Sequence, residues 1–304
     1  MSPRFAPHLA LIAVQILFGI WPIFGKVILR SMSPTSLVAL RITGAALALA
    51  LLQRSLTPLL RMRMKDIILL VMCSLLGIVG NQFLFVKGLS LTTVINAEIL
   101  STTIPAYALT ISILLGYDRW SFKSMGGILI AAAGVLYLIN PTRADLSAHT
   151  TTGNILILTN SFLYAVFIVI SKTLYERYGA LNVITWIFVV GSLITIPVGI
   201  YSLQQENLAA MNATVWVAVA FIILLPTVGA YYLNAYALTR VSPSTVAIYI
   251  YLQPLIAFGF APLLLGEQWN YRTIVAALLI FGGVALVTMN KDNRAVEVSA
   301  SLGN

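Results

Sequence analysis

Ten long apolar runs, most of them free of Asp, Glu, Lys and Arg, constrain the fold of this 304-residue chain more than any other feature. A helix needs about 20 mostly apolar residues to cross a bilayer. Membrane β-barrels instead use alternating segments of about 10 residues. We therefore expect an all-α polytopic membrane protein with ten transmembrane helices. The predicted spans are 9–29, 35–54, 67–88, 93–116, 122–140, 153–174, 180–203, 214–238, 243–265 and 271–290.

The composition excludes most classes of soluble protein. Apolar residues make up 60% of the chain and charged residues 9%, against about 45–50% and 25% in soluble domains. These values exclude a soluble enzyme, a disordered tail and a nucleic-acid binder. The single cysteine, Cys73, excludes an intramolecular disulfide. The net charge of +9 is explained by Lys and Arg in the loops, which orient the helices in the membrane.

The loops between the predicted spans differ in their content of basic residues. With the N-terminus inside, the inner segments hold 12 Lys and Arg and the outer segments hold 5. Cytoplasmic loops carry such an excess, so both termini are expected in the cytoplasm. The first span is expected to be retained, because it contains Pro22 and is too long for a signal peptide. The expected location is a bacterial inner membrane.

The sequence repeats itself at a nearly constant offset of 149 residues, so that Pro105 matches Pro254. Each repeat holds five spans, and an odd number of spans gives the two repeats opposite orientations in the membrane. We expect two inverted five-helix repeats at 8–141 and 152–290, followed by a short cytoplasmic tail at 291–304. Many secondary transporters have inverted repeats, with the substrate site near the bilayer midplane.

Short motifs in both halves carry a family resemblance. They are Trp21 followed by Lys26, Pro34 followed by Arg41, Gly88, Ser242-Pro243-Ser244, Gln253-Pro254, Leu265-Gly266-Glu267 and Gly282-Gly283. On these residues the chain resembles the ten-helix, EamA-type members of the drug/metabolite transporter superfamily. The first half departs from the family pattern, because Gly116-Tyr117-Asp118 stands where Gly-Glu is usual. The resemblance implies a metabolite exporter or permease without fixing its substrate.

Arg41 and Glu98 are charged residues that lie well inside predicted spans rather than within a few residues of a span end. A charge near the bilayer centre costs about 2.5–3.5 kcal/mol on insertion scales, and the repeat counterparts of both residues are apolar. The functional interpretation is that Arg41 attracts a substrate carboxylate and Glu98 binds a substrate amine or a proton. The structural alternative is that Arg41 pairs with helix ends, and that Glu98 is hydrogen-bonded to Thr92 or Asn96 near the headgroups.

Uncharged polar and aromatic residues form a second set of candidates. Buried amides can hold helices together or contact a substrate, and a buried Tyr hydroxyl needs a partner. Tyr249 and Gln253 are four residues apart, so they share one helix face. The candidate substrate-binding residues are Arg41, Asn81, Gln82, Glu98, Tyr231, Tyr232, Tyr249 and Gln253.

Pro105 and Pro254 are the candidate gating residues, because proline interrupts and kinks a helix and matched broken helices indicate a transport site. The alternative is static bending for packing. His8 and His149 are expected in loops, which argues against a histidine proton relay inside the membrane.

The favoured function is a secondary transporter, an exporter of small metabolites such as amino acids that works by alternating access. The alternative is an intramembrane enzyme acting on lipids, but the spans show no cluster of catalytic His, Asp or Glu. No cofactor or metal is expected, and no phosphate-binding loop indicates an ATP-driven pump. The expected partners are a small-molecule substrate and the lipid bilayer. Proton coupling and oligomeric state are left open.

Overall fold

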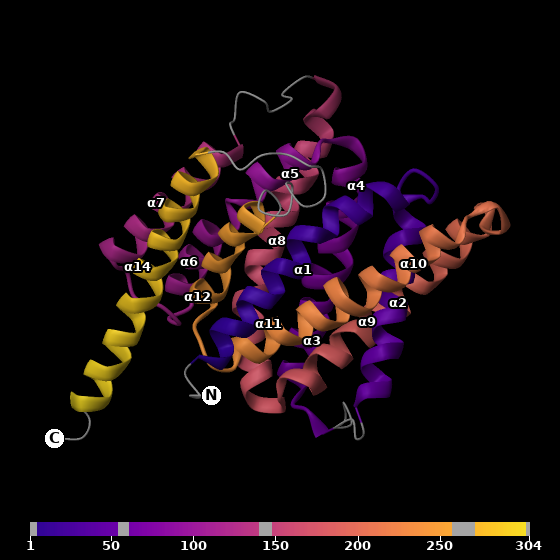
Figure 1. The fold of residues 1–304 in the computed structure, drawn as a ribbon. Coiled ribbons are helices and arrows are strands. Elements are labelled where there is room, and N and C mark those ends of the chain that lie inside the picture. Colours follow the sequence, from indigo (N-terminus) through magenta and orange to yellow (C-terminus); the bar gives the residue numbers. More distant parts are fainter. Residues whose placement is uncertain (1–4, 54–60, 140–147, 257–270, 302–304) are drawn as a thin grey trace.

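The computed structural model describes residues 5–53, 61–139, 148–256 and 271–301, and all regular secondary structure in these ranges is helical (Figure 1). The first half contains α1 (Ala6–Ile28), α2 (Pro34–Leu52), α3 (Met64–Cys73), η2 (Ser74–Gly80), α4 (Asn81–Leu91), α5 (Val94–Ser101), α6 (Ile104–Leu114) and α7 (Phe122–Ile139). The second half contains α8 (Ala148–Tyr178), α9 (Ala180–Leu203), η4 (Leu208–Ala210), α10 (Ala213–Ile222), η5 (Ile223–Gly229), α11 (Ala230–Leu238), α12 (Pro243–Ile248), η6 (Tyr249–Tyr251) and α14 (Tyr271–Ser301).

The helices confirm the predicted all-α polytopic membrane fold. Within the described ranges, seven helical stretches are long and apolar enough to cross a membrane, and two shorter apolar helices lie at Phe122–Tyr137 and Ile274–Met289. The predicted ninth span is described as helix only as far as residue 256. The last helix, α14, continues to Ser301, so it extends well into the segment that was expected to be a tail.

The third and eighth spans each contain a π-helical segment at matched positions. η2 and η5 are both seven residues long, and their bounds are offset by 149 residues, the offset of the sequence repeat. Pro226 lies inside η5 and removes a helix hydrogen bond there. In η2 the corresponding residue is Gly77, where an added Cβ would lie 2.1 Å from the ring of Phe167. π-helical turns are frequent at functional sites, and here they directly precede α4 and α11.

The fourth and ninth spans are also interrupted at matched positions. The fourth span breaks at Thr102 and Thr103, between α5 and α6. The ninth span tightens to the 3₁₀ turn η6 immediately after α12. Each of the predicted spans 93–116 and 243–265 therefore contains an irregular turn shortly before its proline.

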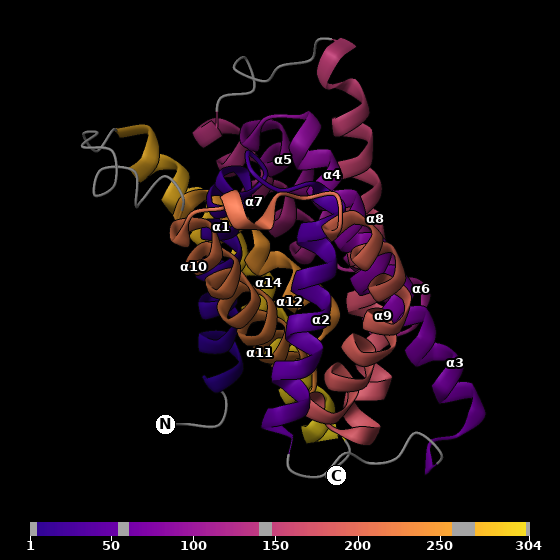
Figure 2. The ribbon, with the colours of Figure 1, turned by 90° about the vertical axis from the view of Figure 1, so that its right-hand side faces the viewer.

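Helix packing follows an inverted symmetry. α1 packs along α11 and η5 of the eighth span, and α8 packs in the equivalent way along α4 and η2 of the third. The pairs α2 and α9, and α7 and α14, join each helix to its own repeat counterpart, and α6 packs against α12, the counterpart of α5. Figures 1 and 2 show α7 and α14 side by side on one flank of the bundle. The start of α1 and the end of α14 lie at the same end, as an even number of crossings requires.

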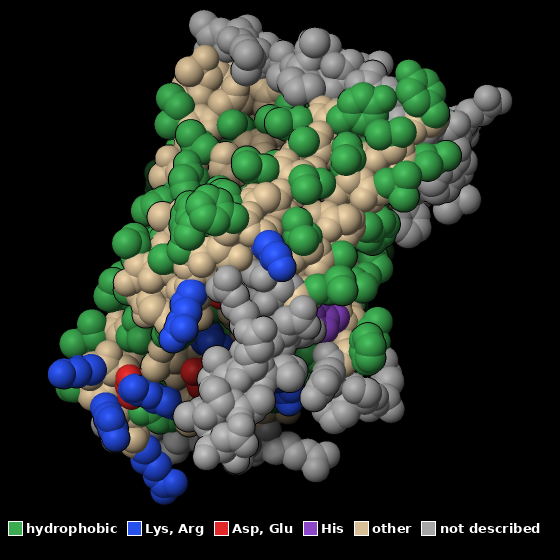
Figure 3. All heavy atoms as spheres, turned by 90° about the vertical axis from the view of Figure 1, so that its left-hand side faces the viewer, with side chains coloured by type: hydrophobic (Ala, Val, Ile, Leu, Met, Phe, Trp, Pro, Cys, Tyr) green, Lys and Arg blue, Asp and Glu red, His purple; other side chains and the backbone are tan. Residues whose placement is uncertain are grey.

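Side chains on the outer surface separate into an apolar flank and a basic end. Figure 3 shows apolar side chains covering most of one flank, while Lys and Arg gather toward the end that holds the termini. Large apolar side chains such as Leu114, Leu129 and Leu278 are more than 60% exposed. A water-soluble surface seldom exposes such a continuous apolar area, whereas a lipid-facing surface requires it.

Hydrogen bonds join the two repeats at the opposite end of the bundle. The Ser33 side chain caps α2 by accepting from the Ser36 backbone N–H. Glu206, just beyond α9, accepts from the Ser33 backbone N–H at 2.8 Å and from the Ser36 hydroxyl at 3.0 Å. Burial opposes ionisation of Glu206, but these hydrogen bonds outweigh it and lower its pKa. A single carboxylate therefore links the start of α2 to the loop that follows α9.

Candidate functional site

A cavity of about 80 Å³ lies between the two repeats. One water molecule needs about 10–15 Å³, so the cavity has room for several water molecules or a small solute. Helices from both repeats contribute to its walls. The lining residues are Phe18, Trp21, Pro22, Arg41, Asn81, Gln82, Phe85, Glu98, Ser101, Ile104, Asn160, Tyr164, Tyr231 and Gln253.

Arg41, on α2, is buried with 3% of its surface exposed. Its Nε and Nη2 atoms donate to the Thr227 hydroxyl at 3.2 and 3.0 Å. Its guanidinium carbon lies 3.9 Å from the centroid of the Trp21 ring. Thr227 belongs to η5 and donates in turn to the Ile222 carbonyl. The π-helical segment therefore positions the hydroxyl that orients Arg41.

Glu98 is the fifth residue of α5 and lines the same cavity. Among the described residues it makes no hydrogen bond and no ion pair, and Arg41 likewise has no carboxylate partner there. The Asn96 side chain instead donates to Thr92 and Asn154. Neither of these two hydrogen bonds involves Glu98. The cavity wall holds one residue of each charge, and no ion pair joins either of them to another described residue.

Four amides line the cavity, of which Gln253 is partly buried and the others are buried, and three of the four have partners. Gln253 donates to Gln15 Oε1 at 2.7 Å. Asn160 donates to the Asn81 backbone carbonyl at 2.8 Å, and Asn81 Oδ1 accepts from the Tyr231 hydroxyl at 3.4 Å. In the fourth amide, Gln82, neither Oε1 nor Nε2 makes a hydrogen bond with any described residue.

Tyr231, on α11, is the centre of an aromatic wall. Its ring lies edge-on to Phe18 at 5.8 Å and to Phe188 at 5.3 Å between centroids, and tilted against Phe167 at 6.5 Å. Edge-to-face pairs at these distances are favourable beyond their buried area. They hold the Tyr231 hydroxyl in place at the polar side of the cavity.

Six of the eight candidate substrate-binding residues line this cavity, and Tyr232 and Tyr249 do not. Tyr232 is 37% exposed, one position away from Tyr231 on the outer side of α11. Tyr249 is buried and its hydroxyl lies 2.7 Å from His8 Nδ1. The expected loop position of His8 is also wrong, because His8 belongs to the first turn of α1. The side chain of His149 is outside the description.

Several lining residues were missed in the sequence, including Phe18, Phe85 and Asn160. Asn160 shows the same signal as Asn81, an amide in the middle of an apolar run, and could have been found by it. Phe18 and Phe85 give no such signal, since aromatic residues are common throughout the spans. Gln15, which bonds Gln253 behind the wall, is a second mid-span amide that the pattern could have identified.

The candidate gating prolines lie beside the cavity. Pro105 is in the first turn of α6, directly after the break in the fourth span, rather than in mid-helix as expected. The first turn accommodates proline, because its N–H would have no helical partner there. Pro254 is buried in the helical stretch that follows η6. The neighbouring residues Ile104 and Gln253 line the cavity.

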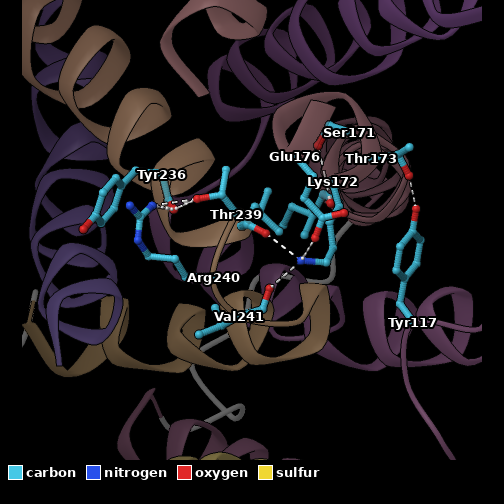
Figure 4. A network of polar contacts seen from close by, with 11 residues as sticks. Tyr117, Ser171, Lys172, Thr173, Glu176, Tyr236, Thr239, Arg240 and Val241 are labelled. Atoms are coloured by element: carbon cyan, nitrogen blue, oxygen red, sulfur yellow. Dashed lines mark hydrogen bonds and ion pairs between the residues drawn. The ribbon is translucent and has the colours of Figure 1, made fainter. Parts of the chain in front are cut away.

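Two repeat-related lysines connect helices that otherwise pack weakly together. Lys26 on α1 donates to the Thr92 carbonyl after α4 at 2.7 Å. Lys172 on α8 donates to the carbonyls of Leu238 and Val241, after α11, at 2.7 and 3.1 Å (Figure 4). Thr92 and Val241 are themselves 149 residues apart. The two lysine contacts therefore lie toward opposite ends of the bundle.

Further polar contacts surround Lys172. It forms an ion pair with Glu176 at 2.8 Å, and the Tyr117 hydroxyl contacts Thr173 (Figure 4). Asp118, at the departure from the family motif, accepts hydrogen bonds from Ser112 at 2.6 Å and from Ser244 at 2.5 Å. Asp118 thus joins the end of α6 to the start of α12.

The family of the chain follows from comparison with known proteins. The model of the EamA-like transporter family matches residues 6–140 and again residues 151–289. The chain belongs to the EamA-like transporter family. The two matches give it two EamA repeats, as the sequence predicted, and make it a membrane transporter. No group of three His, Cys, Asp or Glu in the described ranges could hold a metal ion.

Relatives and a solved structure agree with this assignment. An uncharacterised transporter of Archaeoglobus fulgidus is 26% identical over 92% of this chain and 96% of its own length. A WAT1-related protein of Arabidopsis thaliana is 23% identical over 77% of this chain and 72% of its own. A crystal structure with 17% sequence identity matches with a TM-score of 0.76, covering 94% of this chain and 98% of that one. At that identity the match supports the fold alone.

Proposed function

We propose that this transporter exports small amphipathic metabolites, amino acids foremost, by alternating access across a bacterial inner membrane. The observation that carries the proposal is the pair of opposite charges, Arg41 and Glu98, that line one cavity without forming an ion pair with each other. Uncompensated charges at membrane depth are expensive and usually serve a substrate or ion. An α-amino acid supplies both missing partners, a carboxylate for Arg41 and an ammonium group for Glu98.

The cavity walls favour an amphipathic substrate of small size. Trp21, Phe18 and Tyr231 supply apolar surface beside the charged groups. The guanidinium of Arg41 is already oriented by Thr227 and Trp21, so its binding geometry is fixed before a carboxylate arrives. Such preorganisation reduces the entropy lost on binding. Glu98 can alternatively bind a proton, and proton exchange is then the driving force.

The position of the cavity between the two repeats supports a transport cycle in which it opens to each side in turn. Lys26 closes one end and Lys172 the other, and alternating access requires each contact to open while the other remains closed. Pro105 and Pro254 follow irregular turns in the fourth and ninth spans. Bending there breaks few helix hydrogen bonds, because the regular hydrogen-bond pattern is already interrupted. We assign these prolines to gate movement. The basic end that carries the termini faces the cytoplasm by the positive-inside rule.

Transport by purified protein in liposomes tests the proposal against a lipid-modifying enzyme. Labelled amino acids and unrelated metabolites are offered to the wild type and to Arg41→Met, with protein-free liposomes as the blank. We expect saturable movement of amino acids that Arg41→Met lowers by at least tenfold. No movement of any amino acid, together with chemical change in the liposome lipids, would favour the enzyme.

A further inference from the structure

Gln82 is a buried amide whose hydrogen-bonding capacity is unused. It is the second residue of α4, directly after η2, and 2% of its surface is exposed. More than nine in ten buried polar groups in proteins have a partner, and each one left without a partner costs about 1–3 kcal/mol. Neither Nε2 nor Oε1 has a partner among the described residues. The sequence places this cost on a residue that lines the cavity.

The neighbours of Gln82 are committed elsewhere. The Tyr231 hydroxyl approaches the Gln82 amide closely enough to interact with it, but the two do not have hydrogen-bonding geometry, and the hydroxyl donates to Asn81 Oδ1 at 3.4 Å. The Gln253 amide is bonded to Gln15. A rearrangement that satisfied Gln82 within the protein would therefore take a partner from another buried amide. A substrate in the cavity would satisfy Gln82 without that exchange.

The hydrogen-bond donor and acceptor that Gln82 lacks indicate which chemical group of a substrate could bind it. Oε1 needs a donor and Nε2 needs an acceptor, and in a planar amide the two atoms lie side by side. A primary carboxamide presents the same pair in reverse, so two parallel hydrogen bonds form. A carboxylate offers no donor, an ammonium group offers no acceptor, and an alkyl group offers neither.

We propose that Gln82 determines substrate specificity by selecting amino acids whose side chain carries a primary carboxamide. This inference rests on the proposed function, because Arg41 and Glu98 then hold the α-carboxylate and the α-ammonium group of the same substrate. A site built to form hydrogen bonds rejects an analogue that lacks them, since its buried polar groups are then left without partners. The apolar isostere is therefore the substrate that Gln82 excludes.

Three free amino acids of nearly the same shape provide the test. Asparagine carries a carboxamide, aspartate a carboxylate and leucine two methyl groups on the same branched carbon. Transport of each is measured in proteoliposomes for the wild type, for Gln82→Met and for the control Gln205→Met, which makes the same change at an exposed loop position. We expect the wild type to prefer asparagine to leucine at least tenfold, and Gln82→Met to reduce that ratio at least tenfold while leucine transport is retained or rises. Gln205→Met should behave as the wild type.

The outcomes separate this inference from the proposed function. Equal transport of asparagine and leucine by the wild type, or an unchanged ratio in Gln82→Met, would overturn the role of Gln82 and leave an amino-acid transporter. Transport of none of the three by any variant would overturn the proposed function itself. If Gln82→Met does not fold, Gln82→Glu replaces the donor with an acceptor at the same shape. It should lose the preference for asparagine over leucine, and retention of the preference would count against the proposal.

Discussion

Removing the lysine contacts at the two ends of the bundle is expected to open the cavity toward opposite sides of the membrane. Lys172→Met removes the donor that bridges α8 to the carbonyls of Leu238 and Val241, and Lys26→Met removes the donor to Thr92. Methionine keeps an unbranched, flexible side chain of similar length. If the contacts close alternate gates, Lys172→Met should favour opening at the end that carries the termini. Lys26→Met should favour opening at the opposite end.

The expected change in the ratio of closed to open gate follows from the number of lysine hydrogen bonds that each substitution removes. A hydrogen bond to a charged group contributes about 1.5–3 kcal/mol. Loss of one such bond shifts the ratio of closed to open gate by about 10- to 150-fold, since about 1.4 kcal/mol is a factor of ten. Lys172 makes two carbonyl bonds and Lys26 makes one, so Lys172→Met should have the larger effect. The ion pair of Lys172 with Glu176, whose side chain is 46% exposed, adds at most about 1 kcal/mol.

Cysteine accessibility measures the two gates separately. The chain has one cysteine, the buried Cys73, so Cys73→Ala gives a cysteine-free background. Ser101→Cys then places a single thiol in the cavity wall. A membrane-impermeant maleimide is applied from either side of oriented vesicles. We expect Lys172→Met to raise labelling from the cytoplasmic side and Lys26→Met to raise it from the other side.

Matched controls distinguish gating from loss of charge. Lys87 and Lys123 are exposed lysines, and neither ammonium group makes a hydrogen bond with the described part of the chain. Lys87→Met and Lys123→Met should leave both labelling rates unchanged. Labelling that changes in the same direction in both gate variants, or in neither, would refute the assignment of the lysines to opposite gates.

Three further predictions concern the other charged and proline positions. Glu98→Gln should abolish the pH dependence of transport, measured in liposomes with and without a pH gradient; an unchanged rate and pH dependence would place any coupling elsewhere. Replacing both Pro105 and Pro254 with alanine should slow transport severalfold at unchanged helical content by circular dichroism, and unchanged rates would make both prolines packing features. At Glu206, burial raises the pKa, but the hydrogen bonds from Ser33 outweigh it and lower the pKa below 4.5. Its stabilisation is therefore present above the unfolded-state pKa of 4.5 and lost as pH falls through the lower folded value. The unfolding temperature of Glu206→Gln in detergent should lie below that of the wild type at about pH 7 and converge with it in strong acid, and a constant difference would contradict the role of the carboxylate.

Much of the fold could be predicted because lipid leaves few alternatives. Backbone groups in hydrocarbon must be paired within the helix or barrel, so long apolar runs determine helices almost directly. The breaks inside the spans could not be found in this way. The helices on both sides of Thr102 and Thr103 are mostly apolar, and so is the π-helical segment Ser74–Gly80. Such breaks depend on backbone hydrogen bonding and on close packing at positions such as Gly77, which composition does not record.

The sequence correctly indicated those cavity-lining residues whose polar side chains are unfavourable inside a membrane. Arg41, Glu98 and Gln82 are each costly in a span, and all three line the cavity. The sequence also selected Tyr232 and Tyr249, which do not line the cavity. Tyrosine is tolerated at the lipid surface, at a helix contact and in a cavity, so its presence in a span does not indicate which of these it occupies. A tyrosine therefore carries less positional information than a charge or an amide.

Comparison of the two repeats distinguishes residues that the fold needs in both halves from residues that are present in one half only. Features present in both halves are the π-helical segments, the prolines and the lysine contacts, and they belong to the fold and to the gate movement proposed above. Features present in one half only break the symmetry. The repeat positions that correspond to Arg41 and its partner Thr227 are occupied by the buried apolar residues Phe188 and Ile78. A scaffold that folds with apolar residues at these positions in one repeat does not require the hydrogen-bonded Arg–Thr pair in the other. The cost of burying Arg41 is therefore best explained by a substrate that carries the opposite charge.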